Sequence, residues 1–95
     1  MLNVACLHPR YFSAILAGRK GTEWRRRKRL DSRLEAVAIG EPVLLLECGS
    51  GRAIRARVRA KIRFDYLDGY VYAIRLAEVR PSTSDRTHRQ GWQRV

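Results

Sequence analysis

Residues 52–64 read RAIRARVRAKIRF and carry the clearest periodic pattern in the chain. From Ile54 to Phe64 apolar residues alternate with cations without exception, which is the pattern of a strand with one buried and one solvated face. The cations of this alternation are Arg55, Arg57, Arg59, Lys61 and Arg63. We therefore predict a β-strand with five positive charges along one side.

Strands are also predicted before and after this one. Residues 43–48 form a dense apolar run, and Gly49-Ser50-Gly51 supplies the turn of a hairpin into the basic strand. Asp68-Gly69 predicts a second tight turn, followed by a strand over residues 70–79 that we expect Pro81 to end. Two successive hairpins indicate that most of the domain is sheet.

The N-terminal part of the chain predicts a strand followed by a helix. Residues 2–7 are mostly apolar, and Pro9 suits the first turn of a helix, where its missing N–H is not needed. Gly18 stands where a left-handed residue would end that helix, so we place it over residues 9–17. The apolar residues at helical spacing are Tyr11, Phe12, Ile15 and Leu16.

A chain of 95 residues predicts one domain over residues 1–95. A short helix is expected within residues 30–39, and residues 82–95 form a basic tail that we expect Trp92 to dock on the domain. Strand edges need protection from water and from other chains, which favours closure of the sheet. The predicted fold is therefore α+β, a small β-barrel of about five to six strands with one or two short helices at its rim.

Cysteine content and hydropathy exclude several classes of protein. Cys6 and Cys48 lack the paired spacing of a metal site, so we expect reduced core thiols, no metal and no cofactor. No apolar run approaches the roughly 18 residues that a membrane-spanning helix needs. These features predict a cytoplasmic protein without a membrane partner.

The charge of the chain points to a polyanionic partner. Twenty Lys and Arg against nine Asp and Glu give a net charge of +11, which attracts RNA, DNA or an anionic nucleotide. RNA or a nucleotide is the leading interpretation, and DNA is possible. A protein-interaction module for an acidic partner is a further alternative.

One segment combines glycines with charges of both signs. Residues 18–25 have the form GxKxxExR, and the glycines let the backbone approach a ligand closely. Glu23 and Arg25 are two residues apart, so they share a face of a strand, and Lys20 can reach the same cleft. Glu23 could accept from a base edge while Lys20 and Arg25 neutralise phosphate. The alternative is an ion-pair network that only ties the helix to the strand.

This segment and its surroundings resemble the ASCH domain family, a branch of the PUA-like β-barrels associated with RNA. The resemblance includes residues 14–18 at the end of the helix, the GxKxxExR segment, and residues 39–45, which look like the family's "GD.VLL" strand entry with Glu41 in place of Asp. It implies a PUA-like barrel that binds RNA or a modified nucleotide.

Some relatives act as enzymes, and this resemblance implies a hydrolase as the alternative function. Small bacterial N4-acetylcytidine amidohydrolases use the motif Lys and a Thr three residues later. Here Lys20 matches, Glu23 occupies the Thr position, and Thr22 is one residue early. If the chain is a nucleoside amidohydrolase or a ribonuclease-type hydrolase, Lys20 and Glu23 are the candidate catalytic residues.

The candidate nucleic-acid-binding residues come from three segments. Trp24 could stack on a base, although we expect it to pack in the core. The full predicted set is Lys20, Thr22, Glu23, Arg25, Arg26, Arg27, Lys28, Arg29, Arg55, Arg57, Arg59, Lys61 and Arg63.

Overall fold

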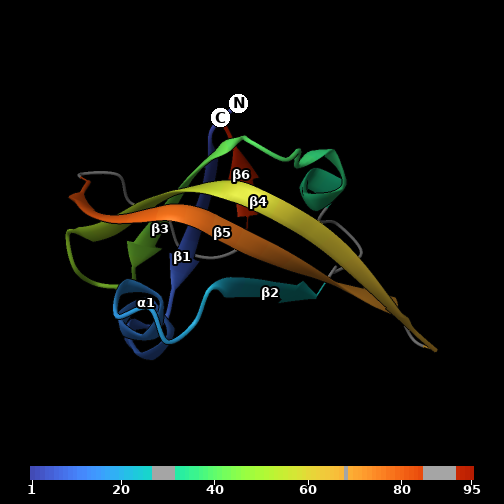
Figure 1. Cartoon of the computed structure of the whole chain (residues 1–95), viewed down its shortest axis with the longest axis horizontal. Coiled ribbons are helices and arrows are strands. Elements are labelled where there is room, and N and C mark those ends of the chain that lie inside the picture. Colours follow the sequence, from blue (N-terminus) through green and yellow to red (C-terminus); the bar gives the residue numbers. More distant parts are fainter. Residues whose placement is uncertain (27–31, 68, 85–91) are drawn as a thin grey trace.

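The computed structural model describes residues 1–26, 32–67, 69–84 and 92–95, with the side chains of residues 25, 26, 32 and 33 left out. Six strands, one α-helix and one 3-10 helix make up this part of the chain (Figure 1). In chain order they are β1 (Asn3–Leu7), α1 (Pro9–Leu16), β2 (Thr22–Arg26), the 3-10 helix η1 (Ser32–Ala36), β3 (Pro42–Glu47), β4 (Arg52–Tyr66), β5 (Gly69–Thr83) and β6 (Trp92–Arg94).

All six strands belong to one sheet with the order β2-β5-β4-β3-β1-β6. Strands β1 and β3 are parallel, and the other neighbours are antiparallel. The hairpin of β4 and β5 crosses the whole length of the molecule, with α1 below it and both termini above it in the view of Figure 1. This long hairpin is the frame on which the other elements are placed.

The predicted barrel closure is wrong, because the sheet is open. Within the described residues β2 pairs with β5 and β6 pairs with β1, so these two strands are the edges. Strand β3 pairs with the beginning of β4, whereas β2 pairs with residues 71–75 at the beginning of β5, at the far end of the hairpin. Beside β6 the core is instead covered by η1, which buries Leu34, and by Val37 just after it. The core beside β6 is therefore shielded by the packing of these side chains, whereas in a barrel it would be shielded by the pairing of the two edge strands.

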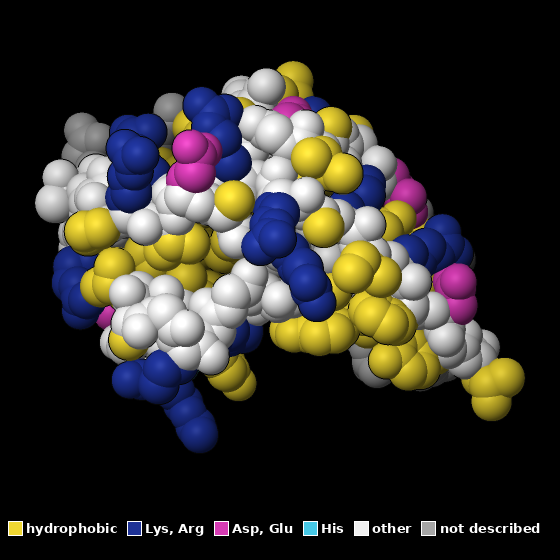
Figure 2. All heavy atoms as spheres, viewed as in Figure 1, with side chains coloured by type: hydrophobic (Ala, Val, Ile, Leu, Met, Phe, Trp, Pro, Cys, Tyr) yellow, Lys and Arg dark blue, Asp and Glu magenta, His cyan; other side chains and the backbone are white. Residues whose placement is uncertain are grey.

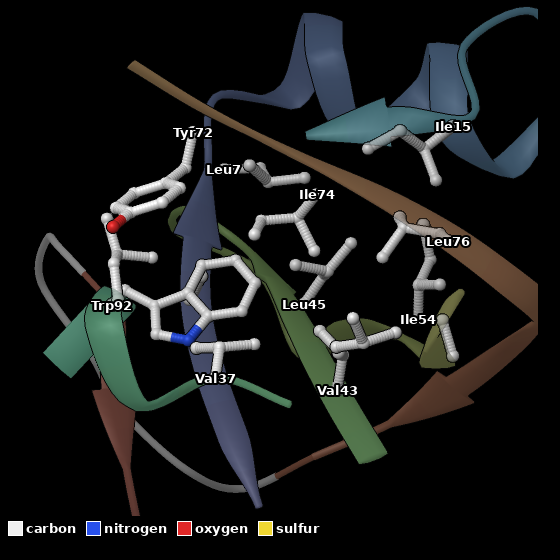
Figure 3. Packing of buried hydrophobic residues seen from close by; sticks show 14 of the residues in the cluster. Leu7, Ile15, Val37, Val43, Leu45, Ile54, Tyr72, Ile74, Leu76 and Trp92 are labelled. Carbon is white, nitrogen blue, oxygen red and sulfur yellow. The ribbon is translucent and has the colours of Figure 1, made fainter. Parts of the chain in front are cut away.

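The main core lies on one face of the sheet, which we call the core face. Helix α1 contributes Phe12 and Ile15, both almost fully buried, and the strands contribute Leu45, Ile54 and Ile74. Figure 3 shows these strand residues packed together, with Trp92 beside Val37 at one side of the cluster. Each fully buried side chain of this size contributes about 1.5–3 kcal/mol to the free energy of folding.

Pro81 does not end β5, contrary to the prediction. It pairs in register with Ile54, and the strand continues to Thr83. Strand β2 covers β5 only at residues 71–75, so among the described residues no strand lies beside Pro81 on the side of β5 away from β4. A proline is tolerated there, since no N–H is needed on an edge.

Strand β6 is held by a polar network around the buried side chain of Asn3. The indole Nε1–H of Trp92 donates to Asn3 Oδ1 at 3.0 Å, and Asn3 Nδ2 donates to the carbonyl oxygen of Pro42 at 3.1 Å. Arg94 pairs with Glu41 through two bonds of 2.6 and 3.0 Å. The Arg94 guanidinium lowers the pKa of Glu41 from 4.5 to about 2.

Glu41→Gln should therefore change how stability depends on acid. The folded-state pKa lies below the ordinary value, so the contribution of Glu41 is complete above about pH 5 and is lost as the pH falls from 4.5 to about 2. We expect the free energy of unfolding of the wild type to drop by about 2 kcal/mol more than that of Glu41→Gln over this range, after allowance for solvent screening. Urea unfolding at a series of pH values measures this difference, and parallel curves would contradict it.

Cys6 and Cys48 are joined by a disulfide, with their Cα atoms 5.9 Å apart, so the prediction of reduced thiols is wrong. Cys6 lies near the end of β1, and Cys48 directly follows the neighbouring strand β3. Parallel pairing of these strands brings together two residues that are 42 apart in the sequence.

Among the described residues, no helix is long and apolar enough to cross a membrane.

Candidate nucleic-acid interface

A recess of about 490 Å³ opens between the end of β1, the start of α1 and β2. We call it the α1–β2 recess. Polar, charged and aromatic side chains make up most of its wall, so it is suited to a ligand that carries both rings and polar edges. Its lining residues are Cys6, Leu7, His8, Tyr11, Lys20, Glu23 and Trp24.

The turn after α1 brings Lys20 to this recess. Gly18 adopts a φ of +76°, which a residue without a Cβ reaches at little cost. The amides of Arg19 and Lys20 both donate to the carbonyl oxygen of Ala14, at 2.9 and 3.1 Å, and so satisfy the end of the helix. The chain then enters β2 at Thr22, so Lys20 is held between a helix end and a strand start.

Two aromatic side chains stand at the rim of the recess. Tyr11 and Trp24 are each 50% exposed, so the expectation that Trp24 packs in the core is wrong. The ammonium of Lys20 lies 4.5 Å from the centre of the Tyr11 ring, a cation–π distance. The Trp24 ring lies 5.6 Å from the Phe64 ring, centre to centre, and remains half-exposed. Half-exposed aromatic rings near a cation suit the stacking of a nucleobase.

Glu23 brings a carboxylate into the same recess. Its side chain is only 4% exposed, and it lies opposite the core residue Ile74 in the register of β2 and β5. An ionised carboxylate accepts hydrogen bonds from amino and imino groups. The recess thus combines an acceptor, a cation and ring faces within one hollow.

Other residues of the predicted motif lie around this recess. Thr22 is half-buried and opens β2, while Arg25 and Arg26 pair through their backbones with Tyr72 and Val71 of β5. The side chains of Arg25 and Arg26, and all of Arg27, Lys28 and Arg29, lie outside the described residues.

The five cations predicted along β4 do not lie on one side. Val58 pairs with Leu76 and Ala60 with Arg75, so Arg59 is one extra residue in β4 and forms a β-bulge. Past the bulge the two faces of the strand exchange. Lys61, the next cation, pairs with the core residue Ile74 and lies on the core face.

The contacts of the cations agree with this exchange of faces. Lys61 donates to the carbonyl oxygens of Leu34 and Glu35, at 3.1 and 2.9 Å, and so ties β4 to η1. Arg63 pairs with Asp65 at 2.8 Å and stacks 3.8 Å from the Tyr70 ring. Both cations have structural partners, which makes them poor candidates for phosphate contacts.

Before the bulge, Arg55 and Arg57 lie on the opposite face of the sheet. Arg57 pairs with Glu78 at 3.1 Å and donates to the carbonyl oxygen of Gly40 at 2.9 Å, whereas Arg55 donates to the hydroxyl of Ser82 at 3.2 Å. Arg59 is exposed and has no hydrogen bond or ion pair with the described part of the chain. In Figure 2, Lys and Arg side chains are spread over the visible face, and acidic side chains lie beside several of them.

Glu35 of η1 is hydrogen-bonded to strand β5, next to the contacts of Lys61 that join η1 to β4. Its carboxylate accepts hydrogen bonds from the hydroxyls of Tyr70 and Tyr72. Burial, together with the hydrogen bond to Glu35, raises the pKa of Tyr72 to about 12. This carboxylate and these two tyrosines are therefore part of the framework rather than of a binding surface.

Two recess residues, His8 and Tyr11, were not among the predicted site residues. His8 caps α1, since its Nδ1 accepts from the amide of Arg10 at 3.2 Å, and its ring meets Tyr11 edge to face. The helical spacing placed Tyr11 with the apolar stripe, but Phe12 and Ile15 alone are buried. Tyr11 precedes Phe12 and so lies at the edge of the apolar stripe rather than at its centre. This position is the signal in the sequence that could have predicted an exposed ring.

Comparison with known proteins identifies solved structures with a similar fold. No protein-family model matches the chain, and no curated protein matches it. The solved structure of a mutant ASCH protein from Zymomonas mobilis superposes with a TM-score of 0.67 at 17% identity, covering 99% of this chain and 89% of that one. The ASCH structure from the same organism gives 0.61 at 19% identity, covering 84% and 69%. The chain therefore has an ASCH-like fold.

Proposed function

We propose that this chain is an RNA-binding domain that holds one base in the α1–β2 recess and phosphates on the surrounding cations. The observation that carries the proposal is the buried carboxylate of Glu23 in a hollow bordered by Lys20 and two half-exposed aromatic rings. A net charge of +11 supplies the general attraction for a polyanion. The resemblance to ASCH domains, which are associated with RNA, points in the same direction.

The recess matches the chemistry of an unstacked base. Glu23 accepts hydrogen bonds, so it favours base edges that donate, such as the amino groups of cytosine and adenine. Trp24 or Tyr11 offers a face for stacking, a contact worth about 1–3 kcal/mol per base. The ammonium of Lys20 is available for the phosphate of the same nucleotide. Single-stranded RNA presents bases in this way, whereas a duplex hides them.

The phosphates that flank the bound base would meet cations from two segments. The arginine-rich residues 25–29 begin with the last two residues of β2, and Glu23 and Trp24 earlier in the same strand line the recess. Arg55 and Arg59 are exposed on β4 before or at the bulge and have no ion pair with a described residue, whereas Arg57 beside them is exposed but paired with Glu78. Lys61 and Arg63 are left out of this proposal because Lys61 ties β4 to η1, and Arg63 is engaged by Asp65 and by the Tyr70 ring.

Binding to single-stranded RNA should weaken steeply with salt. Each neutralised phosphate contributes a slope of about −0.7 to the plot of log affinity against log salt for a single strand. We expect a slope between about −2 and −5, measured by fluorescence anisotropy with a labelled RNA of mixed sequence. Absence of binding at low ionic strength would overturn the proposal. Single-stranded DNA of the same sequence in parallel tests the preference for RNA.

A hydrolase is the second candidate, favoured by one observation. His8, Lys20 and Glu23 all line this recess, so three side chains of types that can transfer protons are gathered in one hollow. An enzyme would release product from RNA or from N4-acetylcytidine and lose turnover in Lys20→Met while staying folded. If RNA binds but neither RNA nor N4-acetylcytidine is converted to product, the domain binds RNA without catalysing a reaction. Competition by an acidic protein on equal terms with RNA would instead favour a protein-interaction module.

A further inference from the structure

A second hollow, of about 260 Å³, lies where β3, β4 and β5 run side by side. Three arginines and one carboxylate line it together with Pro42 and Val43, and it shares no residue with the α1–β2 recess. We call it the arginine recess. Its charged residues are Arg55, Arg57, Arg80 and Glu78.

The sheet places two like charges directly opposite each other here. Arg55 of β4 and Arg80 of β5 are partners in register. Like charges in such a pair destabilise a sheet unless something neutralises them. The arrangement therefore has a cost in the free protein that a bound anion would remove.

The one carboxylate of the recess is engaged by the third arginine. Glu78 pairs with Arg57 at 3.1 Å, and Arg57 also donates to the carbonyl oxygen of Gly40. Arg55 has the hydroxyl of Ser82 as its side-chain partner. Arg80 has no hydrogen bond or ion pair with any described residue. Two guanidinium groups are thus left with no acidic partner among the described residues.

The backbone next to these arginines is strained. Between Arg55 and Arg57, β5 carries one residue more than β4, and Glu78 in this bulge has a φ of +55°. A residue with a Cβ adopts this conformation only at a cost, and such strain is concentrated at ligand sites. The bulge also brings Glu78 to Arg57, so that the third arginine is held in place.

We propose that the arginine recess binds a phosphate group between Arg55 and Arg80. A guanidinium group binds two phosphate oxygens at once, and two arginines that are cross-strand partners in the wall of one hollow suit the dianion of a phosphate. Arg57, fixed by Glu78 and Gly40, adds positive charge at the side of the site. The two hollows share no lining residue, although Arg55 and Arg57 are also among the cations proposed above for the RNA phosphates, so inorganic phosphate tests this site separately from RNA.

Inorganic phosphate is the first probe. Added to the full chain at constant ionic strength, it should shift the NMR signals of the Arg55 and Arg80 Nε–H groups in a saturable way. Arg80→Gln should weaken this binding at least fivefold. Arg75→Gln is the matched control, because Arg75 is an exposed arginine of the same strand outside the recess, and it should leave the affinity unchanged.

Two oligonucleotides distinguish the source of the phosphate. A tighter complex with a 5′-phosphorylated RNA than with its 5′-hydroxyl form assigns the site to a terminal phosphate, and equal affinities that both fall in Arg80→Gln assign it to the chain's internal phosphates. Binding of inorganic phosphate alone assigns it to a free phosphate. Shifts that chloride reproduces, or that Arg75→Gln and Arg80→Gln change equally, would overturn the proposal. The Trp24 indole signal reports the α1–β2 recess separately.

Discussion

Trp92→Ala should lower the free energy of unfolding by about 4 kcal/mol, the largest stability effect that we expect from a single substitution. Trp92 is 1% exposed, lies against η1 and donates its indole N–H to Asn3. The substitution leaves a cavity and also removes the shorter of two hydrogen bonds to a buried amide oxygen, since Arg94 also donates to Asn3 Oδ1, at 3.3 Å. Because domains of this size are stable by only about 5–15 kcal/mol, a large share of the stability would be lost.

Trp24→Ala is the natural control for this experiment. The chain has two tryptophans, and Trp24 is half-exposed, so its removal should cost less than about 1 kcal/mol. Urea unfolding of both variants, followed by circular dichroism, measures the difference. Equal losses of stability would mean that Trp92 does not anchor β6 in the core.

Lys20→Met should weaken binding to single-stranded RNA about tenfold, which corresponds to roughly 1.4 kcal/mol. Lys20 is the cation that lines the α1–β2 recess, and a charge-assisted bond to phosphate is worth about this amount. The ammonium also lies against the Tyr11 ring, so its loss changes the aromatic rim as well. Anisotropy titrations at fixed salt measure the change.

Arg19→Met tests whether this effect depends on position or only on charge. Arg19 is the exposed neighbour of Lys20, does not line the recess, and has no hydrogen bond from its side chain to the described residues. The loss of one general charge should weaken binding by no more than about twofold. If Arg19→Met and Lys20→Met weaken binding equally, RNA is attracted by net charge and the recess has no specific role.

Much of the sheet follows from local patterns in the sequence. The alternation over residues 52–64 and the apolar run over residues 43–48 predicted β4 and β3 within a few residues, because one-sided burial leaves a period of two in the sequence. Pro9 and Gly18 marked the limits of α1, since each has a conformational role that few other residues fill. These signals depend only on near neighbours in the chain.

The errors concern features that depend on distant neighbours. The bulge at Arg59 arises from the register between β4 and β5, so the regular alternation of cations gave no sign that Lys61 would lie on the other face. The sheet stays open where η1 covers the core beside β6. This contact joins segments far apart in the chain, so no local pattern in the sequence predicts it. Disulfide formation between Cys6 and Cys48 likewise follows from the parallel pairing of β1 and β3.

The sequence predicted the charged residues of the candidate site, but not the aromatic residues at its rim. Lys20 and Glu23 were singled out by the spacing of residues 18–25, and both line the α1–β2 recess. Trp24 and Tyr11 were assigned to apolar packing, because hydrophobicity alone does not distinguish an aromatic in the core from one at the rim of a recess. The edge position of β2, which leaves Trp24 half-exposed, becomes visible only in the fold.

The two tryptophans also allow the most direct measurement of where RNA binds. Each gives one indole N–H signal in a ¹H–¹⁵N NMR spectrum, and Trp24→Phe assigns them. As a short single-stranded RNA is added, the Trp24 signal should shift and saturate, while the Trp92 signal, buried against Asn3, should stay in place. RNA binding that leaves the Trp24 signal unmoved would contradict the assignment of the α1–β2 recess as the binding site.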